Sequence, residues 1–209
     1  CRLKNRKKIE LVGHGIDTEL FRPGDNVGAG QGLRILFVGR ISPIKNLDTL
    51  VESIDILVNR KNIKDVKVKI IGSPLEDYEK KYFEKLKQLI AEKKLTNCIE
   101  FLGGKPHQEI VEFYQKSDIF LNLSPTGGID KAVLEAMACS IPALVSNQAF
   151  RKFFPTTWQN ILIFKEKDAK DLAEKILNLR GVGKDASLRE VVTKYHNLDN
   201  LIDKIISKF

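Results

Sequence analysis

The chain has 209 residues, which is enough for one domain with a sizeable hydrophobic core and too few for two large ones. Its hydrophobic fraction of 43% and charged fraction of 30% are ordinary for a globular protein, and no stretch approaches the roughly 20 apolar residues of a spanning helix. The net charge of +8 suits an anionic partner such as nucleotide phosphates, whereas the lack of a basic–aromatic platform or a zinc pattern argues against nucleic acid.

The cysteines and the first residues indicate the setting of the protein. Cys1, Cys98 and Cys139 are odd in number, far apart and without metal-ligand spacing, which favours a reduced, cytoplasmic setting. The basic run from Lys4 to Lys8 would allow peripheral contact with the inner membrane surface. Because the chain starts at Cys1 without an initiator Met, we interpret it as a fragment or a processed piece.

Apolar runs alternate with amphipathic segments along most of the chain. The apolar runs predict strands over residues 34–39, 66–72, 99–103, 118–123, 142–146 and 161–163. The amphipathic segments predict helices over residues 46–58, 76–94, 106–116, 130–138, 168–179 and 197–208. This order predicts an α/β protein with a doubly wound, parallel, Rossmann-like sheet. Such sheets bind ligands at the carboxyl ends of their strands, so the loops at that edge carry the candidate site.

The loop after the first predicted strand carries two cations. Gly39 lets the backbone turn and leaves room for a ligand. Arg40 leaves the strand and Lys45 starts the next helix, so a planar fork and a point charge are offered to one anion such as a diphosphate. Two solvated surface cations are the alternative interpretation.

The loop after the fourth predicted strand leads from Gly127 and Gly128 directly into a helix. This arrangement makes backbone N–H groups and the helix dipole available to an anion. Asp130 is a candidate helix cap. Glu135 lies inside the same apolar helix and needs a partner, because burying a lone carboxylate is costly. Ribose hydroxyls or a salt bridge to a neighbouring lysine would serve.

The loop after the third predicted strand gives a weaker signal. Its backbone groups at Leu102 and Gly103 could read the edge of a nucleotide base without a distinctive side chain. His107, which follows this loop, has the pattern of a surface residue.

Four segments in order resemble the group 1 (family-four) glycosyltransferases of the GT-B fold. They are residues 14–23 (HGIDTELFRP), Gly39-Arg40 with Lys45-Asn46-Leu47, Phe101-Leu102-Gly103 with residues 114–119 (YQKSDI), and residues 134–139 (LEAMAC) followed by Pro142. The resemblance implies the C-terminal half of a GT-B enzyme. Residues 1–32 would be a lead-in segment and interdomain connection, and residues 33–209 the nucleotide-sugar-binding Rossmann-like domain with its C-terminal helices.

The resemblance further implies a retaining, hexosyltransferase-type enzyme of polysaccharide biosynthesis. It would transfer a sugar from a UDP-, GDP- or ADP-linked donor to a glycan or lipid-linked acceptor, which the missing N-terminal half would bind, so the isolated domain is expected to be inactive. Arg40 and Lys45 would be the catalytic pair that neutralises the donor diphosphate, with no metal or other cofactor. Glu135 would hold the ribose hydroxyls. The remaining substrate-binding positions would be Gly39, Leu102, Gly103, Gly127, Gly128, Ile129, Asp130, Lys131, Ala132 and Val133.

One position departs from the pattern of this family. Two glutamates separated by seven residues are usual there, and Glu135 matches the second, but Gly127 stands at the place of the first. That glutamate normally contacts hydroxyls of the donor sugar, so Thr126, Asp130 or Lys131 would have to take over part of its role. The departure motivates an alternative, a non-catalytic nucleotide- or partner-binding relative. Another GT-B enzyme, such as an epimerase or a phosphorylase, is a third interpretation.

Overall fold

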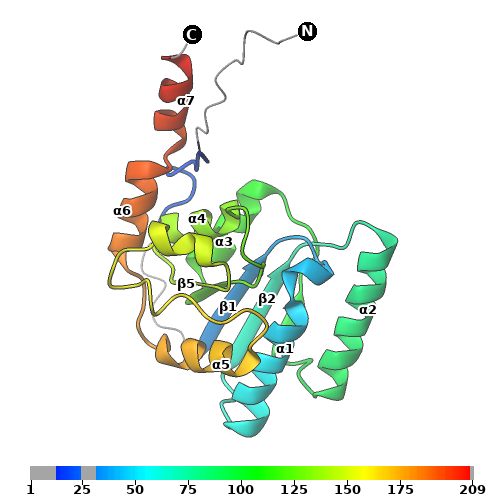
Figure 1. The fold of residues 1–209 in the computed structure, drawn as a ribbon. Coiled ribbons are helices and arrows are strands. Elements are labelled where there is room, and N and C mark those ends of the chain that lie inside the picture. Colours follow the sequence, from blue (N-terminus) through cyan, green and yellow to red (C-terminus); the bar gives the residue numbers. More distant parts are fainter. Residues whose placement is uncertain (1–12, 25–31, 208–209) are drawn as a thin grey trace, which may run out of the picture.

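The structure is a computed structural model that describes residues 13–24 and 32–207, so Cys1 and the basic run from Lys4 to Lys8 lie outside the described residues. Five strands form one parallel sheet with the order β3-β2-β1-β4-β5 (Figure 1). They are β1 (Leu33–Val38), β2 (Val66–Ile71), β3 (Ile99–Phe101), β4 (Ile119–Asn122) and β5 (Ala143–Val145). The predicted doubly wound parallel sheet is therefore confirmed.

Helices cover both faces of this sheet (Figure 1). They are α1 (Leu47–Asp55), α2 (Asp77–Glu92), α3 (His107–Gln115), α4 (Lys131–Ala138), α5 (Ala169–Asn178), α6 (Ala186–Tyr195) and α7 (Leu198–Ile206). The strand order proceeds outward from β1 in one direction to β3 and in the other to β5. Because crossovers between parallel strands are right-handed, α1 and α2 lie on one face and α4 lies on the other. The reversal between β1 and β4 is where such sheets bind ligands.

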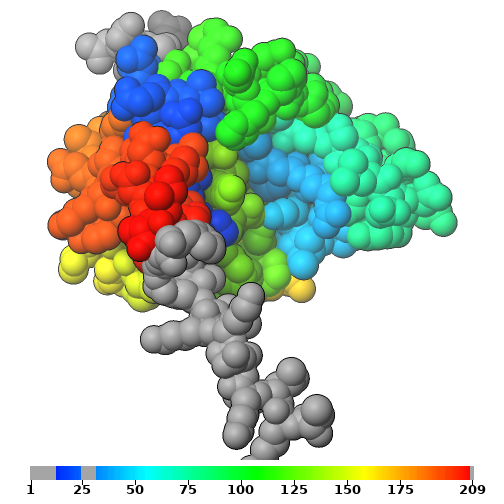
Figure 2. Space-filling model, turned by 90° about the horizontal axis from the view of Figure 1, so that it is seen from above, coloured from blue at the N-terminus to red at the C-terminus, as the bar shows by residue number. Residues whose placement is uncertain are grey.

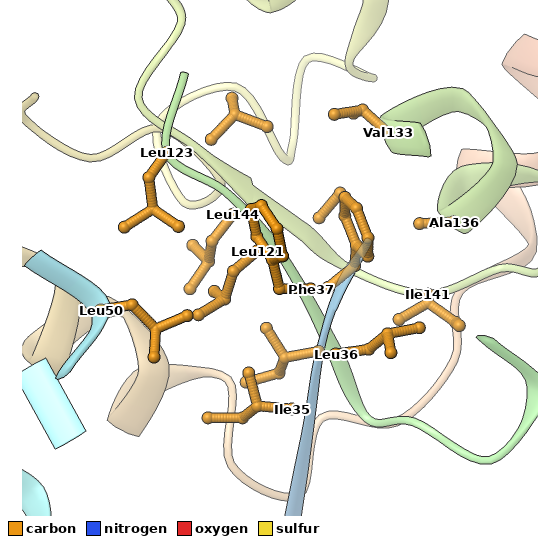
Figure 3. Packing of buried hydrophobic residues seen from close by; sticks show 14 of the residues in the cluster. Ile35, Leu36, Phe37, Leu50, Leu121, Leu123, Val133, Ala136, Ile141 and Leu144 are labelled. Atoms are coloured by element: carbon orange, nitrogen blue, oxygen red, sulfur yellow. The ribbon is translucent and has the colours of Figure 1, made fainter. Parts of the chain in front are cut away.

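The hydrophobic core is centred on β1, which is buried on both faces. Leu36 and Phe37 are neighbours on this strand, point to opposite faces and are fully buried. Figure 3 shows Leu50 of α1 on one side of β1, and Val133 and Ala136 of α4 on the other. Each large apolar side chain buried in this way contributes about 1.5–3 kcal/mol. The core therefore fixes the carboxyl ends of β1 and β4 firmly in place.

Two predicted elements differ from the structure, and one helix of the structure is not predicted. The predicted strand over residues 161–163 is wrong, since Ile163 makes only an isolated bridge with Val145 and the residues before it form turns. The helix α6 is not predicted, because its narrow buried stripe of Leu188 and Val192 lies within a charged segment. The helix expected over residues 46–58 is α-helical only to Asp55 and continues as a π-helix over Ile56–Arg60.

Residues 13–24 lie against the C-terminal helices, as Figure 2 shows for the blue segment beside the orange and red ones. Ile16 bridges Asn197, and the guanidinium of Arg189 donates to the carbonyls of Thr18 and Phe21. The segment at the start of the described chain is therefore held by the segment at its end.

The last helix, α7, extends away from the sheet (Figure 1). Its start is capped by the side chain of Asn197, which accepts from the N–H groups of Asp199 and Asn200. No described side chain of α7 is buried, and Ile202 and Ile206 are exposed. Among the described residues, no helix has the length and apolar character needed to cross a membrane.

Candidate functional site

The candidate site is built at the carboxyl ends of β1 and β4. After β1 the chain makes a short 3-10 turn, Pro43–Lys45, and enters α1 through Asn46. Asn46 adopts a left-handed conformation with φ of 46°, which asparagine tolerates better than most residues, and its side-chain amide donates to the carbonyl of Leu123 at 2.9 Å. This bond ties the start of α1 to the end of β4, and it places Lys45 beside the loop that follows β4.

Lys45 and Asp130 form an ion pair in that position. The Nζ atom of Lys45 lies 2.5 Å from Oδ2 of Asp130 and 3.0 Å from the hydroxyl of Ser124. The amide of Asn122 donates to the same Oδ2 at 2.8 Å, and the hydroxyl of Ser124 at 3.2 Å. Oδ2 thus collects three donors, whereas Oδ1 meets none within the part of the chain that the structure describes.

Asp130 does not act as the helix cap that its position suggests. It occupies the N-cap position of α4, but its side chain accepts no bond from the N–H groups of the helix. Burial alone would raise its pKa, but the hydrogen bond and charge of Lys45, together with Asn122 and Ser124, lower the pKa of Asp130 below its usual value. The carboxylate is therefore ionised at neutral pH.

A groove of about 370 Å³ lies over this ion pair, and it is lined by Ile44, Lys45 and residues 124–130. Gly127 and Gly128 are exposed within it, and a Cβ at position 127 would meet only the carbonyl of Pro125, at 3.9 Å. The backbone therefore forms much of this surface, next to the first turn of α4. Three predicted positions follow the groove along α4: Lys131 is exposed, Ala132 is half-buried and Val133 is buried with its N–H bound to the carbonyl of Asp130.

Arg40 leaves the same edge of the sheet, but its side chain turns toward α2. Its Nε lies 3.1 Å from Oε1 of Glu79, and the Arg40 side chain remains 46% exposed while that of Glu79 is 0% exposed. Lys45 folds back over Gly39, since its Cε is 4.0 Å from the place that a Cβ on residue 39 would occupy. Both predicted cations are therefore paired with carboxylates, and Lys45 is largely covered, whereas Arg40 remains exposed to solvent.

Glu135 is buried in α4 and has two partners. The hydroxyl of Tyr114 donates to its Oε2 at 2.9 Å, and Nε2 of His107 lies 3.0 Å from its Oε1. Burial, and then the charge of Glu135, raise the pKa of Tyr114 well above its usual value, so the hydroxyl remains a donor. Neither partner is the neighbouring lysine that the sequence left open. His107 is exposed as expected, but its ring packs on Phe21 with 4.9 Å between centroids.

Some backbone groups of the predicted base-reading loop already form hydrogen bonds with β2 and the residue after it. The N–H of Leu102 donates to the carbonyl of Ile70 at 2.9 Å, and the carbonyl of Gly103 accepts from the N–H of Gly72 at 2.8 Å. Among the described residues, the carbonyl of Leu102 and the N–H of Gly103 have no backbone partner. These two groups are what the loop offers to a ligand.

Sequence reasoning missed Glu79, Tyr114 and His107. The spacing of Glu76 and Glu79 at the start of a charged segment is a capping-box signal, which predicts the helix start but not the contact with Arg40. Tyr114 and His107 belong to α3, and Glu135 belongs to α4, so no local pattern links them. No cluster of three or more His, Cys, Asp or Glu side chains that could hold a metal occurs in residues 13–24 and 32–207.

The five-stranded parallel sheet and its helices define a C-terminal-type domain of the GT-B glycosyltransferase fold. The chain belongs to the family described as glycosyl transferases group 1, which it matches over residues 25–196. It is 29% identical over 150 residues to a D-inositol 3-phosphate glycosyltransferase of Nocardia farcinica, covering 68% of this chain and 33% of that protein. The chain therefore spans about a third of the length of this curated relative.

Two solved structures share the fold at lower sequence identity. The C-terminal domain of a group 1 glycosyl transferase from Francisella tularensis superposes with a TM-score of 0.73 at 22% identity, over 88% of this chain and 100% of that one. The Anabaena HepE protein, solved in complex with UDP-glucose, has a TM-score of 0.79 at 16% identity, over 93% of this chain and 55% of that one.

Proposed function

We propose that this chain is the donor-binding half of a retaining, hexosyltransferase-type glycosyltransferase. It would bind a UDP-, GDP- or ADP-linked sugar and act on a glycan or lipid-linked acceptor held by an N-terminal half, so that alone it would transfer little or nothing. The observation that carries the proposal is the position of Lys45, which lies in a groove beside the first turn of α4. The HepE protein, which shares the fold, was solved with UDP-glucose.

The diphosphate would lie between Lys45, Arg40 and the start of α4. A helix N-terminus attracts anions through its N–H groups and its dipole. An ammonium and a guanidinium would stabilise the charge that develops on the diphosphate as the bond to the sugar breaks, without a metal. Lys45 must share its charge between Asp130 and the phosphate, because its Nζ already contacts that carboxylate.

The ribose and the sugar would be held by carboxylates. Glu135 would accept from the ribose hydroxyls while Tyr114 and His107 occupy its other acceptor sites, since a carboxylate has about four lone-pair positions. Oδ1 of Asp130 would accept from a hydroxyl of the donor sugar, which supports Asp130 as a partial substitute for the glutamate that Gly127 replaces. The base would meet the carbonyl of Leu102 and the N–H of Gly103.

Calorimetric titration of the protein with UDP, GDP and ADP tests this proposal. We expect one nucleotide to bind, and Arg40→Ala to weaken it by about ten- to a hundredfold, because a charge-assisted contact contributes about 1.5–3 kcal/mol. Arg60→Ala is the matched control, since Arg60 is an exposed arginine paired with Asp55. If none of the three nucleotides binds, or if both variants bind equally well, the proposal is wrong.

A second candidate function, nucleotide binding without transfer, is favoured by Gly127. The space beside this glycine is open, so its lack of a carboxylate does not result from crowding. The two functions differ when a protein carrying both halves is offered donor and acceptor. Sugar transfer supports the enzyme, whereas nucleotide binding without turnover, followed by gain of turnover in Gly127→Glu, supports the second candidate.

A further inference from the structure

Glu79 is the carboxylate that the proposed donor site leaves unexplained. It lies in the first turn of α2, and its side chain is 0% exposed. A buried carboxylate is tolerated only when its oxygens receive hydrogen bonds or an opposite charge. Glu79 has both, and the way in which its two oxygens divide the donors indicates what it does.

One oxygen of Glu79 belongs to the helix start. Oε2 accepts from the N–H of Leu75 at 2.8 Å and from the N–H of Glu76 at 3.2 Å, which completes a capping box with Glu76. The other oxygen, Oε1, accepts from the hydroxyl of Tyr78 at 3.3 Å and lies 3.1 Å from Nε of Arg40. A capping role uses Oε2 alone and does not account for the contact with Arg40.

The ion pair between Nε of Arg40 and Oε1 of Glu79 draws the guanidinium toward α2 and restricts its movement. Arg40 carries five N–H donors in a rigid planar fork. When Nε is held by Glu79, the two terminal nitrogens remain, and the side chain is 46% exposed at the carboxyl edge of the sheet. A terminal pair of nitrogens suits two oxygens of a phosphate, whereas an unheld arginine would lose conformational entropy on binding.

We propose that Glu79 is a positioning residue that holds Arg40 so that its terminal nitrogens face the donor diphosphate. This inference rests on the proposed function and extends it to α2, an element that contributes no other residue to the site. This positioning role explains why the carboxylate of Glu79 lies close to Arg40, a residue proposed to bind an anion. Its charge is used by Nε of Arg40 and by the helix start, and not by the ligand.

The variant that isolates this role is Glu79→Gln. The amide oxygen can replace Oε2 and keep the bonds from the N–H groups of Leu75 and Glu76, while the uncharged amide nitrogen replaces Oε1 and cannot pair with Arg40. Glu84→Gln is the matched control, because Glu84 lies on the same helix and is paired only with Lys87 at the surface. The readout is the ratio of diphosphate to monophosphate affinity, measured calorimetrically with UDP and UMP, or with the GDP or ADP pair if that base binds better.

We expect Glu79→Gln to lower the diphosphate affinity about tenfold or more, to change the monophosphate affinity much less, and to leave the thermal midpoint within a few degrees of the parent. In the double variant with Arg40→Ala, the Glu79 substitution should have little further effect. Arg40→Lys, which leaves the capping box untouched, should reproduce the loss, because an ammonium lacks the planar fork that can pair with Glu79 through one nitrogen and present two others to a phosphate.

An affinity ratio unchanged in a folded Glu79→Gln protein overturns the inference. If Glu79→Gln does not fold, a parental ratio in Arg40→Lys overturns it in the same way. The proposed function fails differently, through absence of nucleotide binding by the parent protein or through a harmless Arg40→Ala, and the inference then fails with it.

Discussion

The Nζ atom of Lys45 lies 2.5 Å from Oδ2 of Asp130, so the cation expected to bind a phosphate is already paired with a carboxylate. This pair joins the turn after β1 to the start of α4 across the point where the strand order reverses. Any anion that uses Lys45 must therefore compete with Asp130 for the ammonium group.

The competition predicts that Asp130→Asn tightens the binding of UDP, or of whichever nucleoside diphosphate binds best. Removing the charge frees Lys45 and reduces repulsion, and we expect a gain of about three- to tenfold, or roughly 0.7–1.4 kcal/mol, that shrinks as salt is added. The same variant should lose part of the extra affinity that the sugar of the donor provides. Calorimetry with UDP and UDP-glucose measures both effects, and weaker binding of UDP would contradict the competition.

The ion pair also predicts a pH dependence of stability. The pKa of Asp130 is lower in the folded protein than its ordinary value of 3.8, so its stabilising contribution is complete above that value and is lost as the pH falls through the folded pKa. The difference in unfolding free energy between the parent and Asp130→Asn should be constant above about pH 5 and should shrink below about pH 4. Urea unfolding over that range measures it, and a difference that grows toward acid pH would exclude a lowered pKa.

Adding one methyl group at Gly72 is expected to lower the stability of the fold strongly. Its φ is +143°, and a Cβ there would lie 1.9 Å from the carbonyl oxygen of Gly39, where β1 and β2 end side by side. Gly72→Ala should lower the unfolding free energy by about 2–4 kcal/mol. Gly128→Ala, where a Cβ would meet nothing within 4 Å, should change it by less than about 0.5 kcal/mol. Similar values for both variants in urea unfolding would mean that the two strands separate easily.

The bond from Tyr114 to Glu135 should stabilise the fold as well as hold the carboxylate. Tyr114→Phe leaves a buried charge with one donor fewer, and we expect a loss of about 1–3 kcal/mol in unfolding free energy. Tyr82→Phe removes a similar bond to Asp48 at an exposed position, and should cost less than about 1 kcal/mol. Equal losses in the two variants would indicate that Glu135 does not depend on Tyr114.

The parts of the fold that sequence predicts are those with a local signal. The strands and most helices follow from apolar runs and 3.6-residue periodicity, and the loop after β1 follows from Gly39, Arg40 and Lys45. What escapes prediction are contacts between elements. The partners of Arg40 and Glu135 come from α2 and α3, and their positions depend on how the helices pack on the sheet.

The strand expected over residues 161–163 and the unpredicted helix α6 are errors of opposite kinds. Residues 161–163 are apolar because Leu162 and Ile163 are buried beside the edge of the sheet, yet only Ile163 bridges β5. The apolar residues here indicate burial, but they do not show whether the backbone forms the hydrogen bonds of a strand. The helix α6 shows the reverse case, in which a charged segment becomes helical because Leu188 and Val192 pack into the core.

Because α7 is exposed, we expect local unfolding of the described chain to begin in this helix. A helix of 9 residues is marginal in water unless one face is covered, and no described side chain of α7 is buried. Its start is anchored by Asn197 and by the bond from the N–H of Leu198 to Ile16, so melting should begin at the opposite end. Backbone amides near Ile205 should then exchange with deuterium orders of magnitude faster than those near Ala136, which lies in the buried part of α4.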